Sequence, residues 1–327
     1  MRSLFTIGCL ISVASARRWA SKRVAVQPGD DPQFVKFAAE NNKNYRDTTD
    51  FRRRESNWKQ SDELIKKTNA KADSKKDGRA LKLAHNHLSD LEEDEYLALL
   101  GLSEDYDESK KVRDMRKGGA KKGKGRKLNI DAVSTGTDHV ELGHMTAVKE
   151  QGQCGSCWAF VATSVLEGTI SSLKETAPVR LSEQQLVDCT NQNSYKNWGC
   201  RGGWMDRAWW YQRDRGAMTE ADYPYVGTDG ASCLTDSTKI AAKTLRWGQV
   251  TSSVEDMQAK LDERPLSIAI DASSREFMLY SSGVLDGTFT TADGTTSECG
   301  TALNHAVTLV GYSLGGEQLT TIEYEIK

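Results

Sequence analysis

The spacing of the cysteines constrains this chain more than any other feature of its 327 residues. Six of the seven cysteines lie between residues 154 and 299, whereas residues 17–127 contain none. Six cysteines in one stretch are enough for three disulfides in an oxidising compartment. If one of the six is instead a free nucleophile, five remain and one of them lacks a partner. Whether all six cysteines can be paired therefore depends on whether one of them is a catalytic nucleophile.

The first 16 residues have the form of a secretory signal. An apolar run from Leu4 to Val13 follows an arginine, and the segment Ala14–Ala16 has the A-x-A pattern of a cleavage site. The run is too short to anchor a mature protein in a membrane. A mitochondrial presequence is the alternative, because no acidic residue occurs before Asp30. We expect residues 1–16 to be a signal peptide and the protein to enter the secretory pathway, reaching a lysosome, a vacuole or the extracellular space.

A basic run separates two parts of different composition. Residues 33–100 carry apolar side chains near helical spacing among many charged residues, which predicts a small helical domain. Leu88–Glu93 predicts the capped start of a short helix. Lys110–Lys127 has ten basic residues against one acidic residue, and we expect it to be a flexible linker open to proteolysis. A tail for nucleic-acid binding or nuclear targeting is the alternative for such a run.

After residue 128 the sequence favours helices first and strands later. Trp158–Leu173 predicts one buried helix, and Leu181–Val187 predicts a second helix with Ser182 as its cap. Residues 266–270, 306–310 and 321–326 have the pattern of strands. This order predicts an α+β protein with two lobes, a helical lobe at about residues 128–240 and a β lobe at about residues 241–327.

The net charge of −2 is unevenly distributed. Residues 1–127 carry 29 Lys and Arg against 20 Asp and Glu, whereas residues 128–327 carry 15 against 26. Two parts of opposite charge attract each other, and this attraction weakens as carboxylates take up protons in acid. Charge alone favours the simpler interpretation that both parts have solvated surfaces.

The pair Cys154 and Cys157 is open to several interpretations from its own residues. A redox dithiol should follow a strand of a βαβ unit, and here a glycine-rich loop precedes a helix. A zinc site needs a second pair of ligands at matching spacing, and none stands out. Two ordinary disulfide cysteines remain an option. A nucleophilic Cys157 would have its thiolate favoured by the N-terminus of the predicted helix and by an imidazolium, for which His305 at the start of a predicted strand is the candidate.

Several motifs together resemble the papain-like cysteine proteases, closest to their cathepsin L-like branch. The segment Gln151–Phe160, QGQCGSCWAF, resembles the active-site segment of that family. Residues 50–69 and 84–90 resemble its inhibitory propeptide, and the resemblance covers residues 33–326. It implies a papain-like fold with a helical lobe, a β-barrel-like lobe and an active-site cleft between them, preceded by a helical prodomain. The further motifs, in the order of the family, are Leu181–Cys189 (LSEQQLVDC), Gly199–Gly203 (GCRGG), Glu220–Tyr225 (EADYPY) and Leu303–Tyr312 (LNHAVTLVGY).

The resemblance also implies roles for individual residues. Cys157 would be the nucleophile of a cysteine endopeptidase that forms an acyl-enzyme, His305 its acid–base partner, and Gln151 a donor to the oxyanion beside the backbone N–H of Cys157. Cys154 would pair with Cys200 and Cys189 with Cys233. No metal and no cofactor is implied. The residues that match substrate-binding positions, with an apolar preference at P2, are Gly202, Gly203, Trp204, Met205, Ala269, Asn304 and Ala306.

The chain departs from the family at three places. The family has an asparagine in an N-S-W-G motif directly after a strand that resembles Tyr324–Lys327, and no asparagine here matches it. Cys299 is left unpaired, because its partner in the family follows the same motif. Both features indicate a missing C-terminal segment, so we expect the chain as given to be unstable or weakly active. His139 stands where the family usually has tryptophan.

We therefore expect a zymogen. Residues 17–127 would be an inhibitory propeptide that covers the active site, and residues 128–327 the catalytic domain. The expected partners are a peptide or protein substrate and the chain's own propeptide; no nucleic acid and no membrane anchor are expected, and the protein is expected to be a monomer. The alternative from a different class is a non-catalytic, papain-like binding or protease-inhibitory protein.

Overall fold

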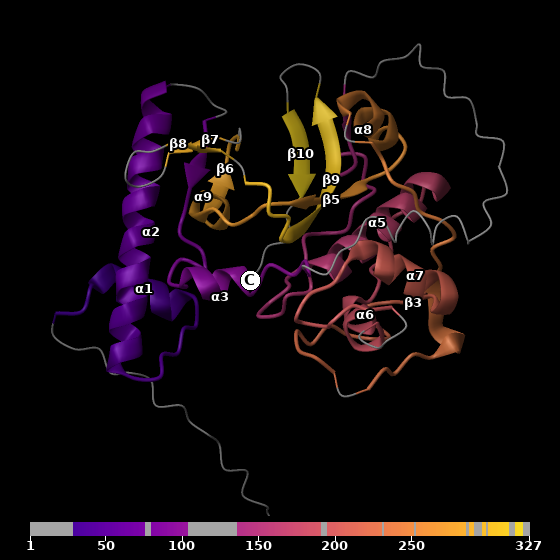
Figure 1. The fold of residues 1–327 in the computed structure, drawn as a ribbon, viewed down its shortest axis with the longest axis horizontal. Helices are drawn as coiled ribbons and strands as arrows, with labels where there is room; N and C mark the ends of the chain where they lie inside the picture. The colour runs from indigo at the N-terminus through magenta and orange to yellow at the C-terminus, as the bar shows by residue number, and fades with distance from the viewer. Residues whose placement is uncertain are drawn as a thin grey trace, which may run out of the picture. The chain divides into compact units, whose positions relative to one another are not determined.

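The computed structural model describes residues 29–75, 80–103, 136–190, 195–230, 232–251, 253–285, 288–290, 296–298, 300–313 and 318–322 (Figure 1). The predicted signal peptide, the basic linker, Cys299 and the chain after Ile322 lie outside the described residues. The chain divides into two compact units, Met1–Ser56 and Asn57–Lys327. Each unit is described by itself.

Aromatic side chains hold the first unit together. Helix α1 (Pro32–Glu40) begins after Asp31, whose carboxylate accepts hydrogen bonds from the backbone N–H groups of Gln33 and Phe34. Phe34 is wholly buried and stacks on Phe37 and Tyr45, with Phe51 edge-on to it. The sequence predicted these aromatic residues as a helical core, and this prediction is confirmed.

Helix α2 (Thr48–Lys75) continues the apolar residues that the sequence placed at helical spacing over residues 33–100. Within the second unit its Trp58, Leu64 and Ile65 are buried. The side chain of Asn69 both donates to the carbonyl oxygen of Leu83 and accepts from its N–H, each at 2.9 Å, so it fixes strand β1 (Lys82–Leu83) beside the helix. The amide of Asn69 therefore pairs with the backbone of Leu83 in the way that a neighbouring strand would.

Helix α3 (Glu93–Leu97) starts later than the segment Leu88–Glu93 suggested. Its N-cap is Glu92, which forms a capping box with Glu95. Ser89 is used differently, because its hydroxyl accepts from the N–H of Asn86 and closes a turn before the helix. Serine caps and serine turns have the same local sequence signal, so the sequence alone did not separate them.

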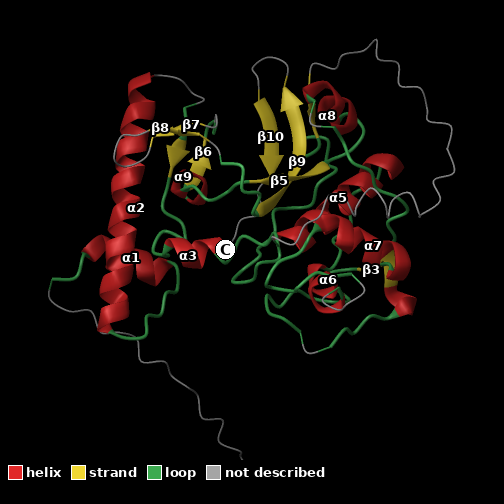
Figure 2. Ribbon diagram, viewed as in Figure 1, coloured by secondary structure: helices red, strands yellow, loops and turns green. Residues whose placement is uncertain are grey.

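Three helices lie among the described residues from 157 to 215 of the second unit. They are α5 (Cys157–Lys174), α6 (Glu183–Cys189) and α7 (Met205–Arg215), which Figure 2 shows grouped together. The hydroxyl of Ser182 accepts from the N–H of Gln185 and caps α6, as predicted. Strand β3 (Ala217–Met218) pairs with β4 (Ile240–Ala242), which follows the short 3₁₀ helix η1 (Ser237–Lys239).

Strand β9 (His305–Ser313) is the centre of the main sheet (Figure 1). It pairs antiparallel with β10 (Gln318–Ile322), β5 (Leu266–Ile270) and β2 (Gly136–Asp138). The predicted strands 266–270 and 306–310 are confirmed, whereas the strand predicted at 321–326 begins earlier, at Gln318. Strand β2 was not predicted, and it adds residues from before α5 to this sheet. Helix α8 (Val254–Leu261) packs against β9.

The remaining elements lie between β5 and β9 in the sequence. Helix α9 (Arg275–Met278) leads into β6 (Tyr280–Ser282), which pairs with β1, and β7 (Thr288–Thr290) pairs with β8 (Thr296–Glu298). The described residues thus combine helices with strands that pair antiparallel, which confirms the predicted α+β class. Within the described residues, no helix combines the length and the apolar character needed to cross a bilayer.

His139, which stands at a position usually held by tryptophan in the resembled family, is buried at the end of β2. Its Nε2 lies 2.6 Å from the carbonyl oxygen of Leu261, and its Nδ1 lies 2.9 Å from Nδ1 of His144. Burial lowers the pKa of His139, while the Leu261 carbonyl acts against this shift. The ring therefore fills a core position as a neutral imidazole that links β2 to α8.

A buried ion cluster joins the segment before Gln151 to two helices. The ammonium of Lys149 lies 2.6 Å from a carboxylate oxygen of Glu167 on α5 and 2.5 Å from one of Glu183 on α6. None of the three side chains exposes more than 2% of its surface. Burial raises the pKa of Glu183, and the Lys149 charge opposes this rise. The cluster fixes the chain immediately before the predicted catalytic motif.

Replacing the cation of this cluster tests its structural role. Lys149→Met leaves two buried carboxylates facing each other without a counter-charge, so the free energy of unfolding should fall by about 3–5 kcal/mol. Chemical denaturation measures the change. Lys174→Met is the matched control, because Lys174 is an exposed lysine at the end of α5, and its effect should stay within about 0.5 kcal/mol. A loss below about 1 kcal/mol for Lys149→Met would contradict the role of the cluster.

Candidate active site

Cys157 is the first residue of α5 and is wholly buried. The predicted place at a helix N-terminus is therefore confirmed. Burial raises the pKa of the Cys157 thiol to about 11, although backbone hydrogen bonds from Ala306, Gly101 and Trp158 act in the opposite direction. The expected thiolate is not the favoured form here, because desolvation outweighs the helix N-terminus and the nearby N–H groups.

His305 is the first residue of β9 and lies opposite Ile270 on β5. Its side chain is 1% exposed, and burial lowers the pKa of the imidazole to about 4. Within the described part of the chain its Nδ1 has no hydrogen-bond partner. The next residue, Ala306, hydrogen-bonds the Cys157 sulfur through its backbone. The structure thus brings the beginning of β9 to the beginning of α5, as the predicted pair requires.

Gln151 directs its side-chain amide at carbonyl oxygens. The residue is wholly buried, and its Nε2 donates to the oxygen of Leu99 at 3.0 Å and to that of Cys154 at 2.5 Å. Its Oε1 has no partner among the described residues. A neutral amide that donates to a peptide carbonyl has the chemistry expected of an oxyanion donor.

Residues Leu99–Ser103 cover this region, and we call them the covering segment. Its backbone makes three hydrogen bonds to predicted substrate-binding residues. Gly203 donates from its N–H to the oxygen of Gly101 at 2.9 Å, and the N–H of Leu102 donates to the oxygen of Asn304 at 3.1 Å. The indole N–H of Trp204 donates to the oxygen of Ser103 at 2.8 Å. Leu102 and Gly203 also form an isolated parallel bridge, so the segment pairs like a strand at this one residue, whereas Leu99 still belongs to the turn that follows α3.

The side chain of Leu102 occupies the region predicted to bind an apolar P2 residue. It belongs to the same buried apolar cluster as Trp204, Met205 and Ala306, and Ala269 packs against that cluster. Gly202 borders the segment with its backbone, which has a φ of 110° that favours glycine. The seven predicted substrate-binding residues thus hydrogen-bond the covering segment, border it, or belong to or pack against the apolar cluster that contains Leu102.

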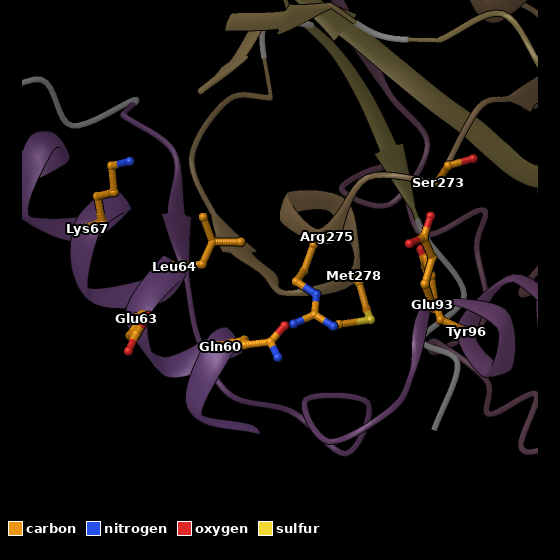
Figure 3. Close-up of a pocket in the computed structure, with 9 residues that line it drawn as sticks. All are labelled: Gln60, Glu63, Leu64, Lys67, Glu93, Tyr96, Ser273, Arg275 and Met278. Atoms are coloured by element: carbon orange, nitrogen blue, oxygen red, sulfur yellow. The ribbon is translucent and has the colours of Figure 1, made fainter. Parts of the chain in front are cut away.

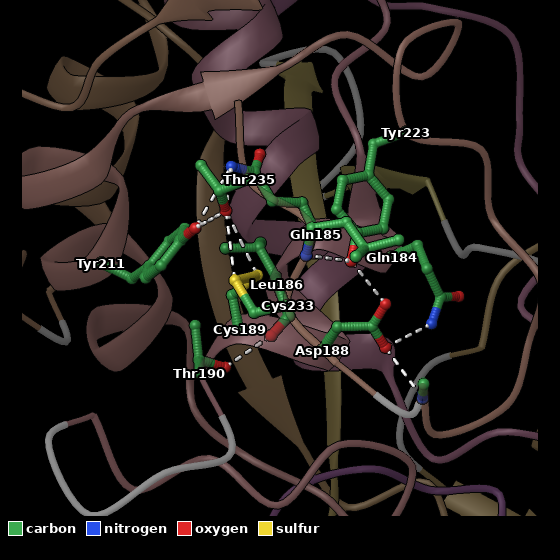
Figure 4. The surroundings of a disulfide bond; sticks show 12 residues. Gln184, Gln185, Leu186, Asp188, Cys189, Thr190, Tyr211, Tyr223, Cys233 and Thr235 are labelled. Carbon is green, nitrogen blue, oxygen red and sulfur yellow. Dashed lines mark hydrogen bonds between the residues drawn. A yellow bond between two sulfur atoms is a disulfide. The ribbon is translucent and has the colours of Figure 1, made fainter. Parts of the chain in front are cut away.

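The described residues contain two disulfides, and both are the pairs that the resemblance implied. Cys154 is bonded to Cys200, and the N–H of Gly155 donates to the oxygen of Cys200 at 2.9 Å. Cys189 is bonded to Cys233 beside the hydrogen-bonded side chains of Gln185 and Thr235 (Figure 4). Cys157 is the free cysteine of the described residues. Because Cys154 is already bonded, the pair Cys154 and Cys157 is not a redox dithiol here.

A separate pocket of about 460 Å³ lies between α2, α3 and α9 (Figure 3). Charged side chains of both signs line it, among them Glu63, Lys67, Glu93 and Arg275. None of its lining residues is a predicted catalytic or substrate-binding residue. It therefore has no part in the arrangement around Cys157.

Sequence reasoning did not identify two parts of this region. The covering segment was included in the long predicted propeptide without a role of its own. Its central residue, Gly101, stands between Leu100 and Leu102, and this glycine was the signal that could have located the segment. Tyr225 was quoted in a motif but received no role, although its hydroxyl donates to the backbone oxygen of Gln151 at 2.7 Å. That contact joins residues 74 positions apart, and no local pattern predicts it.

Comparison with known families supports the same assignment. Residues 133–323 match the family model described as papain family cysteine protease. Residues 34–96 match the model described as cathepsin propeptide inhibitor domain (I29). The covering segment, Leu99–Ser103, lies between these two matched regions, shortly after the propeptide match ends at residue 96.

Individual relatives show the extent of the similarity. Digestive cysteine proteinase 1 of Homarus americanus is 43% identical over 188 residues, which make up 57% of this chain and 55% of that protein. Vignain of Ricinus communis is 39% identical over 199 residues, or 59% of this chain and 51% of that protein. The chain thus spans about half the length of these curated relatives.

Solved structures resemble the fold over a longer range. The structure of digestive procathepsin L 3 of Tenebrio molitor larval midgut has a TM-score of 0.68 at 29% identity, covering 86% of this chain and 83% of that one. The recombinant stem bromelain precursor has a TM-score of 0.64 at 27% identity, covering 86% and 82% of the two chains. The similarity therefore includes the part of the chain that precedes residue 133.

The close approach of Gly101 to the site leads to a testable substitution. A Cβ at this position would overlap the carbonyl oxygen of Gly155 and lie 3.0 Å from Sγ of Cys157. Gly101→Ala should push the covering segment away from the sulfur and let water in. Partial hydration lowers the pKa of a buried thiol, so iodoacetamide should label Cys157 of the uncleaved protein about tenfold faster at pH 7.

Mass spectrometry of the peptide that contains Cys157 measures this rate. Gly248→Ala is the matched control, because a Cβ at Gly248 meets no atom within 4 Å, and labelling should be unchanged. If Gly101→Ala is labelled at the rate of the parent protein, the covering segment does not limit access to the sulfur.

Proposed function

Since the chain belongs to the papain family of cysteine proteases, we propose that it is the zymogen of a cysteine endopeptidase. Residues 17–127 would act as the inhibitory propeptide and residues 128–327 would belong to the catalytic domain. Two disulfides fit an oxidising compartment, which supports a route through the secretory pathway to a lysosome, a vacuole or the cell exterior. We place the maturation cleavage in or near the basic run Lys110–Lys127.

One observation carries the proposal. The amide of Gln151 donates to a peptide carbonyl, that of Leu99, while Gly101 of the same segment hydrogen-bonds the sulfur of Cys157. The chain's own backbone therefore contacts both an amide that could serve as an oxyanion donor and a cysteine at a helix N-terminus. The proximity of these two groups to one peptide segment supports acyl transfer from a peptide.

The chemistry follows from the roles of these groups. With the covering segment removed, Cys157 and His305 would regain water, so a thiolate and an imidazolium become accessible near neutral pH. The thiolate would attack the scissile carbonyl, and the oxyanion would accept hydrogen bonds from Gln151 Nε2 and the N–H of Cys157. His305 would protonate the leaving amine and then take a proton from the water that hydrolyses the acyl-enzyme.

While the covering segment is in place, the site would be catalytically inactive because of the charge states of its two main groups. Burial raises the pKa of Cys157 to about 11 and lowers that of His305 to about 4, so near pH 7 both groups are neutral. A thiol is a poor nucleophile, and a neutral imidazole does not stabilise a neighbouring thiolate by charge. The covering segment would thus inhibit by excluding both substrate and water.

Leu102 supports an apolar preference at P2. In the covered state this leucine packs with Trp204, Met205 and Ala306, and Ala269 lies against the same cluster. None of these side chains carries a charge that would bind arginine. The chain's own leucine would therefore occupy the pocket that a substrate side chain takes after activation.

Kinetics with peptide substrates tests both the activity and the specificity. After the propeptide is removed, fluorogenic peptides with Leu or Phe at P2 should be cleaved with a kcat/KM at least about tenfold above that for Arg at P2, because the pocket offers apolar contact without a counter-charge. Cys157→Ala should abolish turnover. No cleavage of any peptide would point to a non-catalytic binding or inhibitory protein, and a preference for Arg would refute the proposed pocket.

A further inference from the structure

The hydroxyl of Tyr225 lies between two parts of the loop that carries the proposed oxyanion donors. It is 2.7 Å from the backbone oxygen of Gln151 and 2.8 Å from the hydroxyl oxygen of Ser156. Gln151 carries one donor on its side chain, and Ser156 immediately precedes Cys157, whose backbone N–H is the other. One hydroxyl therefore contacts both ends of the loop Gln151–Ser156.

The direction of these hydrogen bonds follows from the number of protons. The carbonyl of Gln151 can only accept, so the single proton of the Tyr225 hydroxyl is donated to it. The Ser156 hydroxyl is then the donor to the Tyr225 oxygen at 2.8 Å, a much shorter contact than its other acceptor, the carbonyl oxygen of Cys154 at 3.4 Å. The chain of hydrogen bonds thus runs from Ser156 through Tyr225 to Gln151.

The loop Gln151–Ser156 needs such a restraint because its two glycines allow its backbone many conformations. Gly152 follows Gln151 directly and has a φ of 66°, a region that glycine enters without steric cost. Gly155 is a second glycine within the same six residues. The disulfide of Cys154 fixes the middle of the loop, but it leaves the carbonyl of Gln151 to be held by another group. The Tyr225 hydroxyl is the partner that the structure provides.

Tyr225 is itself held in place. Its N–H donates to a carboxylate oxygen of Glu220 at 2.9 Å, and its ring lies edge-on to Phe160 on α5, with ring centroids 4.9 Å apart. Burial raises the pKa of Tyr225 to about 12, so the hydroxyl keeps its proton throughout the pH range of a protease. A rigid donor on a packed ring can set the position of a flexible loop.

We propose that Tyr225 is a positioning residue of the catalytic site, which holds Gln151 so that its side-chain amide meets the oxyanion. This inference rests on the proposed protease activity. Among the described residues the Tyr225 hydroxyl bonds to Ser156 and Gln151, so in this proposal it acts through the backbone of Gln151 rather than on the reacting atoms. Its hydroxyl should therefore matter for the transition state more than for substrate binding, and only while Gln151 is present.

A double-mutant cycle tests this dependence. Removing an oxyanion donor costs about a hundredfold or more in kcat, so Gln151→Ala should show a loss of that size. Tyr225→Phe keeps the ring and removes the hydroxyl, and we expect kcat to fall about tenfold with KM unchanged within about twofold. In the Gln151→Ala background the same change should lower kcat by less than about twofold, because the group that it positions is gone.

Tyr223→Phe is the matched control from the same motif. Its hydroxyl donates to Asp188 at 2.7 Å beside the second disulfide (Figure 4), away from Gln151, so kcat should stay close to that of the parent protein. Ser156→Ala is a second probe, because it removes the donor to Tyr225 and leaves the bond to Gln151 intact. It should give a smaller loss of kcat that also disappears without Gln151, and it decides the question if Tyr225→Phe does not fold.

The outcomes separate this inference from the proposed function. No peptide cleavage by the activated parent protein would overturn both. Cleavage that Tyr225→Phe leaves unchanged would overturn the positioning role alone. An equal loss of kcat with and without Gln151 would show that the hydroxyl supports the fold in general, and this result would also overturn the role.

Discussion

The close approach of the Gly101 backbone to Cys157 is the contact on which the rest of the site depends. Gly101 can lie against the carbonyl of Gly155 and near the sulfur only because it has no side chain. Cys157 and His305 are both buried, and desolvation moves their pKa values apart, in the directions that leave both groups neutral. The same segment fills the apolar cluster with Leu102 and occupies the amide of Gln151 through Leu99. One stretch of chain therefore contacts the Cys157 sulfur, the Gln151 amide and the apolar cluster.

The loop Gln151–Ser156, which we propose to carry the oxyanion donors, is held by interactions of different kinds at successive positions. The buried ammonium of Lys149 ties the chain before the loop to α5 and α6. The disulfide of Cys154 fixes its middle, and the Tyr225 hydroxyl ties Gln151 to Ser156. A loop with two glycines would otherwise lose its geometry, and oxyanion stabilisation depends on donors that are already in place before the reaction. Rigid support around a flexible loop explains why so many buried polar groups surround this site.

The sequence predicted the elements whose signals are local. Helix α5, the Ser182 cap of α6 and the strands β5 and β9 follow from apolar runs and a capping residue, and each was confirmed. What it did not predict depends on distant contacts. Strand β2 has three residues and becomes a strand only by pairing with β9, far along the chain. The hydroxyl of Tyr225 meets a carbonyl 74 residues away. The serine at position 89 has the signal of a cap, and the turn that it closes is decided by packing around it.

The pH dependence of Cys157 alkylation tests the central claim most directly. In the uncleaved protein the iodoacetamide labelling of Cys157, followed by mass spectrometry, should keep rising about tenfold per pH unit up to about pH 10, because the thiol titrates near 11. After removal of the propeptide, labelling should already be fast below pH 7, with Cys157→Ala as the control for assignment. Equal labelling of Cys157 at pH 6 before and after this removal would contradict the account.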